Sequence, residues 1–217
     1  MRPSDFRTNY GYHDLKVDNL MDRPEYKIIE SWVRPKSKIL DLGCGEGSLG
    51  QKLITKKNSH VVGIDISDKG LNIARAKGLQ VQFHDLDSPL PFKDSSFDYA
   101  ICNVTIQMVY RPGFVIQEMQ RVAKNLIISF PNFAYWKSRL QLLLMGKMPN
   151  SSLYGYSWHN TRHIHHLSIK DFKEFIRTLN MNITNKTFFG KDSSNPTHLA
   201  NFMPNFFARV AIFEIKQ

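Results

Sequence analysis

Short apolar segments alternate with helix-like patterns along the first 130 residues of the chain. The segments expected to form strands are 38–42, 60–65, 81–84, 97–103 and 125–130. Between them, the segments 48–57, 67–77 and 113–122 repeat apolar residues every three or four positions, as amphipathic helices do. Strands that alternate with helices favour βαβ units and a parallel sheet. Two later runs, 182–189 and 206–215, are expected to add two strands.

The alternation breaks in the region 133–166. Residues 135–144 predict an amphipathic helix whose leucines, Leu140, Leu143 and Leu144, pack in the core or face a partner. The remainder is rich in Ser, Tyr, Trp, Asn and His, and such a long irregular insertion is usually a functional loop or lid. Beyond it, we expect a capped helix at 168–179 and a loop at 190–204.

A glycine-rich segment, DLGCGEG at 41–47, joins the first predicted strand to the first predicted helix. Gly43 and Gly45 allow a ligand to approach the backbone because they lack a Cβ and tolerate positive φ, and Gly47 allows tight packing where the helix begins. The helix start presents free N–H groups and a positive dipole end. Asp41 disfavours a pyrophosphate and suits a cationic amino group, so the segment predicts S-adenosylmethionine rather than a dinucleotide.

Polar residues also follow the next predicted strands, at the sheet edge where ligands bind in open α/β folds. Asp65 ends the second strand, where an acid accepts hydrogen bonds from ribose hydroxyls. Asp85 follows the third strand and can accept from an adenine amine, and Asn103 ends the fourth. The alternative at each position is helix capping or loop solubility, and for Asn103 it stays open.

Composition narrows the functional classes further. The chain has 217 residues, a net charge of +10 and only two, isolated, cysteines, which favours a single domain in a reducing compartment. Its Lys and Arg are dispersed, so we expect a solvated basic surface and no nucleic-acid partner. No apolar run approaches the ~20 residues of a membrane span and no signal peptide is visible, so a cytoplasmic location is predicted.

The glycine segment and the strand-end acids resemble those of the class I S-adenosylmethionine-dependent methyltransferases. The resemblance covers about 36–132. It implies an α/β, Rossmann-like fold with a seven-stranded, mostly parallel sheet, an antiparallel last strand and helices on both faces. It also implies that S-adenosylmethionine is bound by Asp41, Gly43, Cys44, Gly45, Asp65, Ile66, Asp85, Leu86 and Asn103.

Segments outside the cofactor motif resemble the MetW family of methionine biosynthesis. They are RPEYKII at 23–29, ISFPNFAYW at 128–136, MGKMP at 145–149 and YSWHNTRHIH at 156–165. This resemblance implies action beside homoserine O-acyltransferase. The expected domains are an N-terminal extension or lid at 1–22 and an S-adenosylmethionine-binding domain at 23–217 with an insertion at 133–166.

The insertion contains the only dense supply of bases, at His159, His163, His165 and His166. His163 and His165 can point the same way on an extended segment, so they are the candidate catalytic residues, although the histidines could instead hold the loop in place. No acid or cysteine stands at a suggestive spacing beside them, so no metal site is predicted.

Two functions remain open from the sequence. The first is methyl transfer to an unidentified small-molecule acceptor. Asn103, Ser129, Asn132 and the segment 159–166 would face the acceptor, and Tyr154, Tyr156 or Trp158 would line its pocket or pack the loop. The alternative is a non-catalytic accessory subunit that binds and activates homoserine O-acyltransferase. A role in RNA methylation is supported only by the charge.

Overall fold

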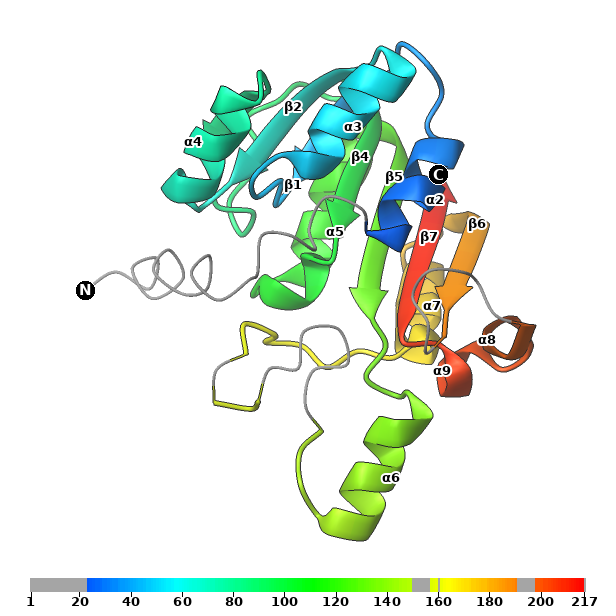
Figure 1. Ribbon diagram of the computed structural model, residues 1–217. Helices are drawn as coiled ribbons and strands as arrows, with labels where there is room; N and C mark the ends of the chain where they lie inside the picture. Colours follow the sequence, from blue (N-terminus) through cyan, green and yellow to red (C-terminus); the bar gives the residue numbers. More distant parts are fainter. Residues whose placement is uncertain (1–22, 150–156, 160, 191–197, 217) are drawn as a thin grey trace. The chain divides into compact units, whose positions relative to one another are not determined.

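The computed structural model describes residues 23–149, 157–159, 161–190 and 198–216 (Figure 1). The expected extension at 1–22 lies outside the described residues, as do Tyr154 and Tyr156. Within the described residues, no helix is long and apolar enough to cross a membrane.

Seven strands form one sheet in the order β3-β2-β1-β4-β5-β7-β6. They are β1 (Lys38–Leu42), β2 (His60–Asp65), β3 (Gln80–Phe83), β4 (Phe97–Asn103), β5 (Ala123–Pro131), β6 (Asn182–Phe189) and β7 (Val210–Lys216). β1 pairs in parallel with β2 and β4, β2 pairs in parallel with β3, and β7 runs antiparallel to β6. The predicted α/β, Rossmann-like sheet, mostly parallel with an antiparallel last strand, is confirmed.

The described helices are α2 (Pro24–Trp32), α3 (Ser48–Lys57), α4 (Asp68–Ala76), α5 (Pro112–Val122), α6 (Trp136–Met145), α7 (Ile169–Thr178), α8 (His198–Phe202) and α9 (Pro204–Phe207), with a 3₁₀ turn η2 (Ile106–Met108). Five of them, α3 to α7, begin and end close to their predicted positions. Ser67 caps α4 by accepting from Gly70 N at 3.2 Å. Ser168 and Asp171 form the predicted capping box of α7.

Two expectations for the late part of the chain were wrong. The loop predicted at 190–204 contains α8, and the strand predicted at 206–215 begins only at Val210. Pro204 at the first position of α9 explains the second difference, because its fixed φ favours the start of a helix. The helix α2, which also begins at a proline, was not predicted.

α6 does not pack as a core helix. Ser138 is its only buried residue, whereas Leu140, Leu143 and Leu144 are 42%, 79% and 75% exposed. Four consecutive apolar residues at 142–145 point to several sides of a helix, so they cannot share one buried face. The interpretation of these leucines as core is therefore wrong, and a partner-facing role remains as a prediction.

The chain divides into two compact units, each with its own core. Unit 1 consists of 1–103 and 111–127, and unit 2 of 104–110 and 128–217. Fully buried aliphatic side chains of β1, β2 and β4, such as Leu40, Ile64 and Ile101, fill the core of unit 1. In unit 2 the rings of Phe130 and Phe172 lie 4.7 Å apart, and those of Phe172 and Phe213 lie 5.1 Å apart.

Candidate functional site

The turn between β1 and α3 is built from glycines in a left-handed conformation. Gly43, Gly45 and Gly47 have φ values of 72°, 55° and 75°, which side chains with a Cβ rarely adopt. The turn is tied to β2, since Gly43 N and Cys44 N both donate to Ile64 O, at 2.8 and 3.1 Å. The backbone of this turn is therefore held in a conformation that would be strained for any residue other than glycine.

Asp65 at the end of β2 connects this turn to the next helix. Its Oδ2 accepts from Gly45 N at 2.8 Å and its Oδ1 accepts from Ser67 N at 2.8 Å. A carboxylate accepts about four hydrogen bonds, so holding the turn is compatible with accepting from a ligand as well. Ile66 lies between Asp65 and Ser67, directly before the N-cap of α4.

Asp41 has the one carboxylate oxygen among the described residues that is buried without a hydrogen-bond partner. Its side chain is 2% exposed, and its Oδ2 has no hydrogen-bond partner among the described residues. Burial, and then the charge of Asp65, raise the pKa of Asp41 to about 7. A buried carboxylate oxygen without a donor is costly, and a cationic or hydrogen-bond-donating ligand group would remove that cost.

Tyr26 lies on the unpredicted helix α2, near enough to Asp41 for the charge of that acid to affect its pKa. Tyr26 is 7% exposed, and burial raises its pKa to about 12, against the lowering effect of Arg23 and with smaller contributions from Asp41 and Glu46. The only sequence signal for Tyr26 was its place in the family-like segment at 23–29.

The Cβ positions of Cys44 and Gly47 pack closely against neighbouring elements of the fold. An added Cβ on Gly63 of β2 would lie 2.7 Å from Cys44 Sγ, so the thiol is directed at β2, and burial raises its pKa. Cys44 can therefore serve a ligand through its backbone only. An added Cβ on Gly47 would lie 2.9 Å from Ala74 Cβ, which fits the expected tight packing at the helix start.

The segment that carries Asp85 and Leu86 begins beside Asp65. His84 N donates to Asp65 O at 3.0 Å, and Asp65 pairs with Phe83 in the β2–β3 register. Asp85 then shapes its own turn, because its Oδ1 accepts from Asp87 N at 3.0 Å. Leu86 is 6% exposed.

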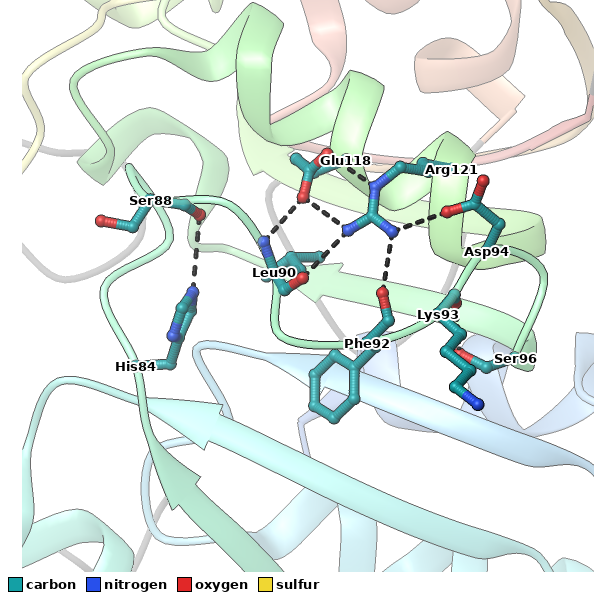
Figure 2. A network of polar contacts seen from close by, with 9 residues as sticks. All are labelled: His84, Ser88, Leu90, Phe92, Lys93, Asp94, Ser96, Glu118 and Arg121. Carbon is teal, nitrogen blue, oxygen red and sulfur yellow. Dashed lines mark hydrogen bonds and ion pairs between the residues drawn. The ribbon is translucent and has the colours of Figure 1, made fainter.

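Arg121 and Glu118 of α5 hold the rest of this segment (Figure 2). The Arg121 guanidinium donates to Leu90 O at 3.0 Å, to Phe92 O at 2.8 Å and to Asp94 Oδ1 at 2.8 Å. Glu118 pairs with Arg121 at 2.8 Å and accepts from Leu90 N at 2.6 Å. The hydrogen bonds from Arg121 lower the pKa of Glu118. The segment after β3 is thus fastened to a helix, which the sequence did not predict.

Unit 1 therefore brings the predicted cofactor residues to the carboxyl ends of adjacent parallel strands. Asp41 pairs with Gly63 of β2 on one side and with Ile101 of β4 on the other, two residues before Asn103. Figure 1 shows β1, β2 and β4 side by side. This is the edge at which open α/β sheets bind ligands.

Unit 2 contains a second polar cluster, around Val104 and Gln107. Val104 has a φ of 53°, a strained conformation for a β-branched residue that costs of order 1–3 kcal/mol. Two bonds of 3.0 Å hold it, from Val104 N to Ser129 O and to Ser129 Oγ. Gln107 Nε2 donates to Val104 O at 2.9 Å, and Gln107 O accepts from Ile164 N at 2.9 Å.

Among the described residues of unit 2, three side-chain atoms are buried without a hydrogen-bond partner: Gln107 Oε1, His163 Nε2 and His165 Nε2. Burial, and then the charge of His166, lower the pKa of His163 to about 4. The His166 ring lies 4.5 Å from that of Phe133, so this histidine packs the loop. Among the described residues, no group of three or more His, Cys, Asp or Glu side chains could hold a metal ion.

Asn132, which was expected to face an acceptor, bonds to the chain itself. Its Nδ2 donates to Ala208 O at 2.8 Å and to Asn205 O at 3.2 Å, and its Oδ1 accepts from Ala134 N at 3.2 Å. These bonds give the buried amide of Asn132 a structural role. The buried amide with an unpartnered oxygen is instead that of Gln107, which was not predicted from the sequence.

A family model described as methionine biosynthesis protein MetW matches residues 23–215. The chain belongs to the MetW family. Its similarity extends to a bifunctional methionine biosynthesis protein MetXA/MetW of Rhodopirellula baltica, at 32% identity over 72% of this chain and 27% of that protein. A ubiquinone biosynthesis O-methyltransferase of Hahella chejuensis is 29% identical over 56% of this chain and 50% of that protein.

Solved structures agree on the fold of this MetW-family chain. An S-adenosylmethionine-dependent methyltransferase from Mesorhizobium loti superposes with a TM-score of 0.64 at 17% identity, covering 89% of this chain and 98% of that chain. One from Thermotoga maritima gives a TM-score of 0.64 at 18% identity, covering 89% and 87%. The chain therefore has the class I methyltransferase fold. It spans 27% to 62% of the lengths of the first curated relatives that it matches.

Replacement of Gly63 by alanine should disturb the glycine turn of this MetW-family protein from behind. The new methyl group would lie 2.7 Å from Cys44 Sγ and 2.9 Å from Cys44 Cβ, so the turn must shift. We expect a loss of about 1–3 kcal/mol in the free energy of unfolding, as for other overpacked sites, and weaker S-adenosylmethionine binding. Urea unfolding and calorimetry measure the two effects.

The matched control is Gly50→Ala, whose methyl group would meet Leu79 Cδ2 at 2.5 Å. That atom is the far end of a flexible side chain, which also lies 2.9 Å from the Cβ position of Gly47, so this variant crowds the start of α3 without touching Cys44. Equal ligand binding by Gly63→Ala and Gly50→Ala would show that the turn does not depend on the Gly63–Cys44 contact.

Proposed function

We propose that this protein binds S-adenosylmethionine in unit 1 and transfers its methyl group to a small-molecule acceptor in methionine biosynthesis. The observation that carries the proposal is the buried, unpartnered Oδ2 of Asp41, beside a turn of three glycines with positive φ. The family membership and the methyltransferase fold of the solved neighbours support the same cofactor.

The chain offers a separate group for each part of this cofactor. Asp41 receives the ammonium group of the methionine moiety, since its unpartnered oxygen lacks a donor. Asp65 accepts from the ribose hydroxyls while it retains its bonds to Gly45 N and Ser67 N. Asp85 and Leu86 receive the adenine, held by the segment that Arg121 fastens to α5. Asn103 lies at the end of β4, beside the reactive end.

The bound cofactor supplies a sulfonium methyl group, which an acceptor atom attacks in line while the C–S bond breaks. The residues of the chain position the acceptor and, where it carries a proton, receive that proton. With a pKa of about 4, His163 is neutral at pH 7 and a weak base. It is therefore a weak candidate for the base that receives this proton.

The ionisation of Asp41 gives this proposal a pH signature. An ammonium group binds the carboxylate, and the pKa of Asp41 is about 7, so affinity should rise between pH 5.5 and 7.5 and then level off. Asp41→Asn should remove this dependence and weaken binding about tenfold to a hundredfold, the worth of a hydrogen bond to a charged group. Calorimetry with S-adenosylmethionine across this pH range measures both.

Asp41→Asn should weaken cofactor binding but stabilise the unliganded protein. The pKa of Asp41 is raised on folding, so the folded state binds more protons between about pH 4 and pH 7, and stability falls as pH rises through this window. Asp41→Asn should remove that loss and raise the melting temperature at pH 8. A variant that keeps the wild-type pH slope of binding would sink the assignment of Asp41.

A second function, an accessory subunit that binds and activates homoserine O-acyltransferase, is supported by the Rhodopirellula baltica relative, which carries the names MetXA and MetW on one chain. The exposed leucines of α6 would form its interface.

Leu143→Lys should then abolish co-elution of this protein with the acyltransferase and lower the activity of the acyltransferase. Phe202→Lys, at a residue that is 81% exposed on α8, is the control. Absence of co-elution for the wild type would refute this function.

A further inference from the structure

The C-terminal end of α6, in unit 2, exposes apolar side chains on all sides. Leu142, Leu143, Leu144 and Met145 are 46%, 79%, 75% and 69% exposed. Successive residues of a helix point about 100° apart, so these four side chains surround the helix axis. No atom of the described residues lies within 4 Å of a Cβ built on Gly146, which follows the helix. Single exposed apolar residues are common, whereas contiguous apolar surface of this kind marks a site of interaction.

The other end of α6 is anchored to the rest of unit 2. Ser138 is buried, and Arg139 Nε donates to Ala134 O at 2.6 Å. Arg139 also reaches α9, because its Nη2 donates to Asn205 O at 3.3 Å and its guanidinium lies 5.4 Å from the centre of the Phe206 ring. Figure 1 shows α6 apart from β6 and β7, the last strands of its unit. The helix is thus held at its base, and its apolar end is left exposed.

The charge of unit 2 indicates the sign of the charge on its partner. The Lys and Arg are dispersed along the chain, but acids are scarce in this unit. It contains 11 of the 29 Lys and Arg and only four of the 19 Asp and Glu, so it carries +7 of the net charge of +10. No acid occurs between Glu118 and Asp171. Lys137 and Lys147, which flank the leucines of α6 in the chain, are both exposed. An anionic partner therefore complements this end of the helix.

The distribution of the apolar residues distinguishes a lipid surface from a protein groove. A helix that binds in a groove contributes one apolar stripe, and the rest of its circumference stays polar. Residues 142–145 are apolar without interruption, so a groove would leave some of them in water. A bilayer surface surrounds an inserted helix end, and its anionic headgroups attract Lys and Arg. The ten residues of α6 extend about 15 Å, against ~30 Å for the hydrocarbon core, so the helix can enter the surface but cannot cross it.

We infer that the C-terminal end of α6 binds the surface of an anionic lipid bilayer. The side chains of residues 142–145 enter the boundary between the headgroups and the acyl chains, and Lys147 extends its ammonium group to the lipid phosphates. The inference goes beyond the proposed function, because lipid binding requires neither the cofactor nor a methyl acceptor. The accessory-subunit function would place a protein on the same leucines, so the two occupants exclude each other at this helix.

Co-sedimentation of the full chain with lipid vesicles tests the inference. One set of vesicles is phosphatidylcholine alone, and the other is an equal mixture of phosphatidylcholine and phosphatidylglycerol. We expect saturable binding to the mixed vesicles, which weakens as salt is added, and much weaker binding to phosphatidylcholine. The double variant Leu143→Gln/Leu144→Gln should weaken binding at least about tenfold, the worth of one leucine side chain returned to water. Lys147→Gln should weaken it about fivefold.

Leu199→Gln is the matched control, because it also removes an exposed leucine of unit 2, on α8, and should leave vesicle binding unchanged. Equal binding to both kinds of vesicle, unchanged binding in the double variant, or an equal loss in Leu199→Gln would overturn the inference. Absence of vesicle binding by the wild type, together with co-elution with the acyltransferase that the double variant abolishes, would assign this end of α6 to a protein instead. Calorimetry should show equal S-adenosylmethionine binding by the wild type and the double variant, so a failure of lipid binding leaves the proposed function intact.

Discussion

The carboxylate of Asp65 joins the parts of unit 1 on which the candidate cofactor site depends. One of its oxygens holds Gly45 N in the glycine turn, the other holds Ser67 N at the start of α4, and its own carbonyl accepts from His84 N at the start of the next segment. Each of these bonds involves a buried or half-buried backbone amide that would otherwise lack a partner. The Asp65 carboxylate thus sets the relative positions of the residues that follow β1 and β2, and the backbone carbonyl of the same residue holds the segment after β3.

Asp41 has the opposite character, because its buried Oδ2 has no hydrogen-bond partner among the described residues. Its burial raises its pKa to about 7, so the unliganded protein bears an energetic cost at the place where a cationic group would relieve it. Unit 2 shows the same pattern with neutral atoms, at Gln107, His163 and His165. An unpartnered atom is not sufficient by itself, because Ser59 Oγ is also buried without a partner and lies before β2, whereas Asp41 Oδ2 lies beside the glycine turn.

The residues that the sequence predicted well are those whose local conformation requires them. Gly43, Gly45 and Gly47 indicate positive φ values, which few other residue types adopt. Ser67 and Ser168 indicate the starts of helices, because their side chains cap the first backbone N–H groups. Gln107 was missed because an amide in a short apolar segment carries no local signal; its importance comes from His165 N, far away in the chain. The clamp of Arg121 on Leu90 and Phe92 was missed for the same reason. The exposure of α6 could not be predicted either, since consecutive leucines also occur in cores.

The central claim is that the glycine turn, held by Asp65, binds S-adenosylmethionine. Calorimetric titration of this cofactor into the wild type and Asp65→Ala tests it most directly, with Glu174→Ala as a control that removes an exposed acid of α7. The account predicts saturable binding by the wild type and the control, and a loss of at least about a hundredfold in Asp65→Ala, because the substitution removes the bond to Gly45 N in the turn and the bond to Ser67 N before α4, as well as the ribose acceptor. Equal affinity in the wild type and Asp65→Ala would contradict it.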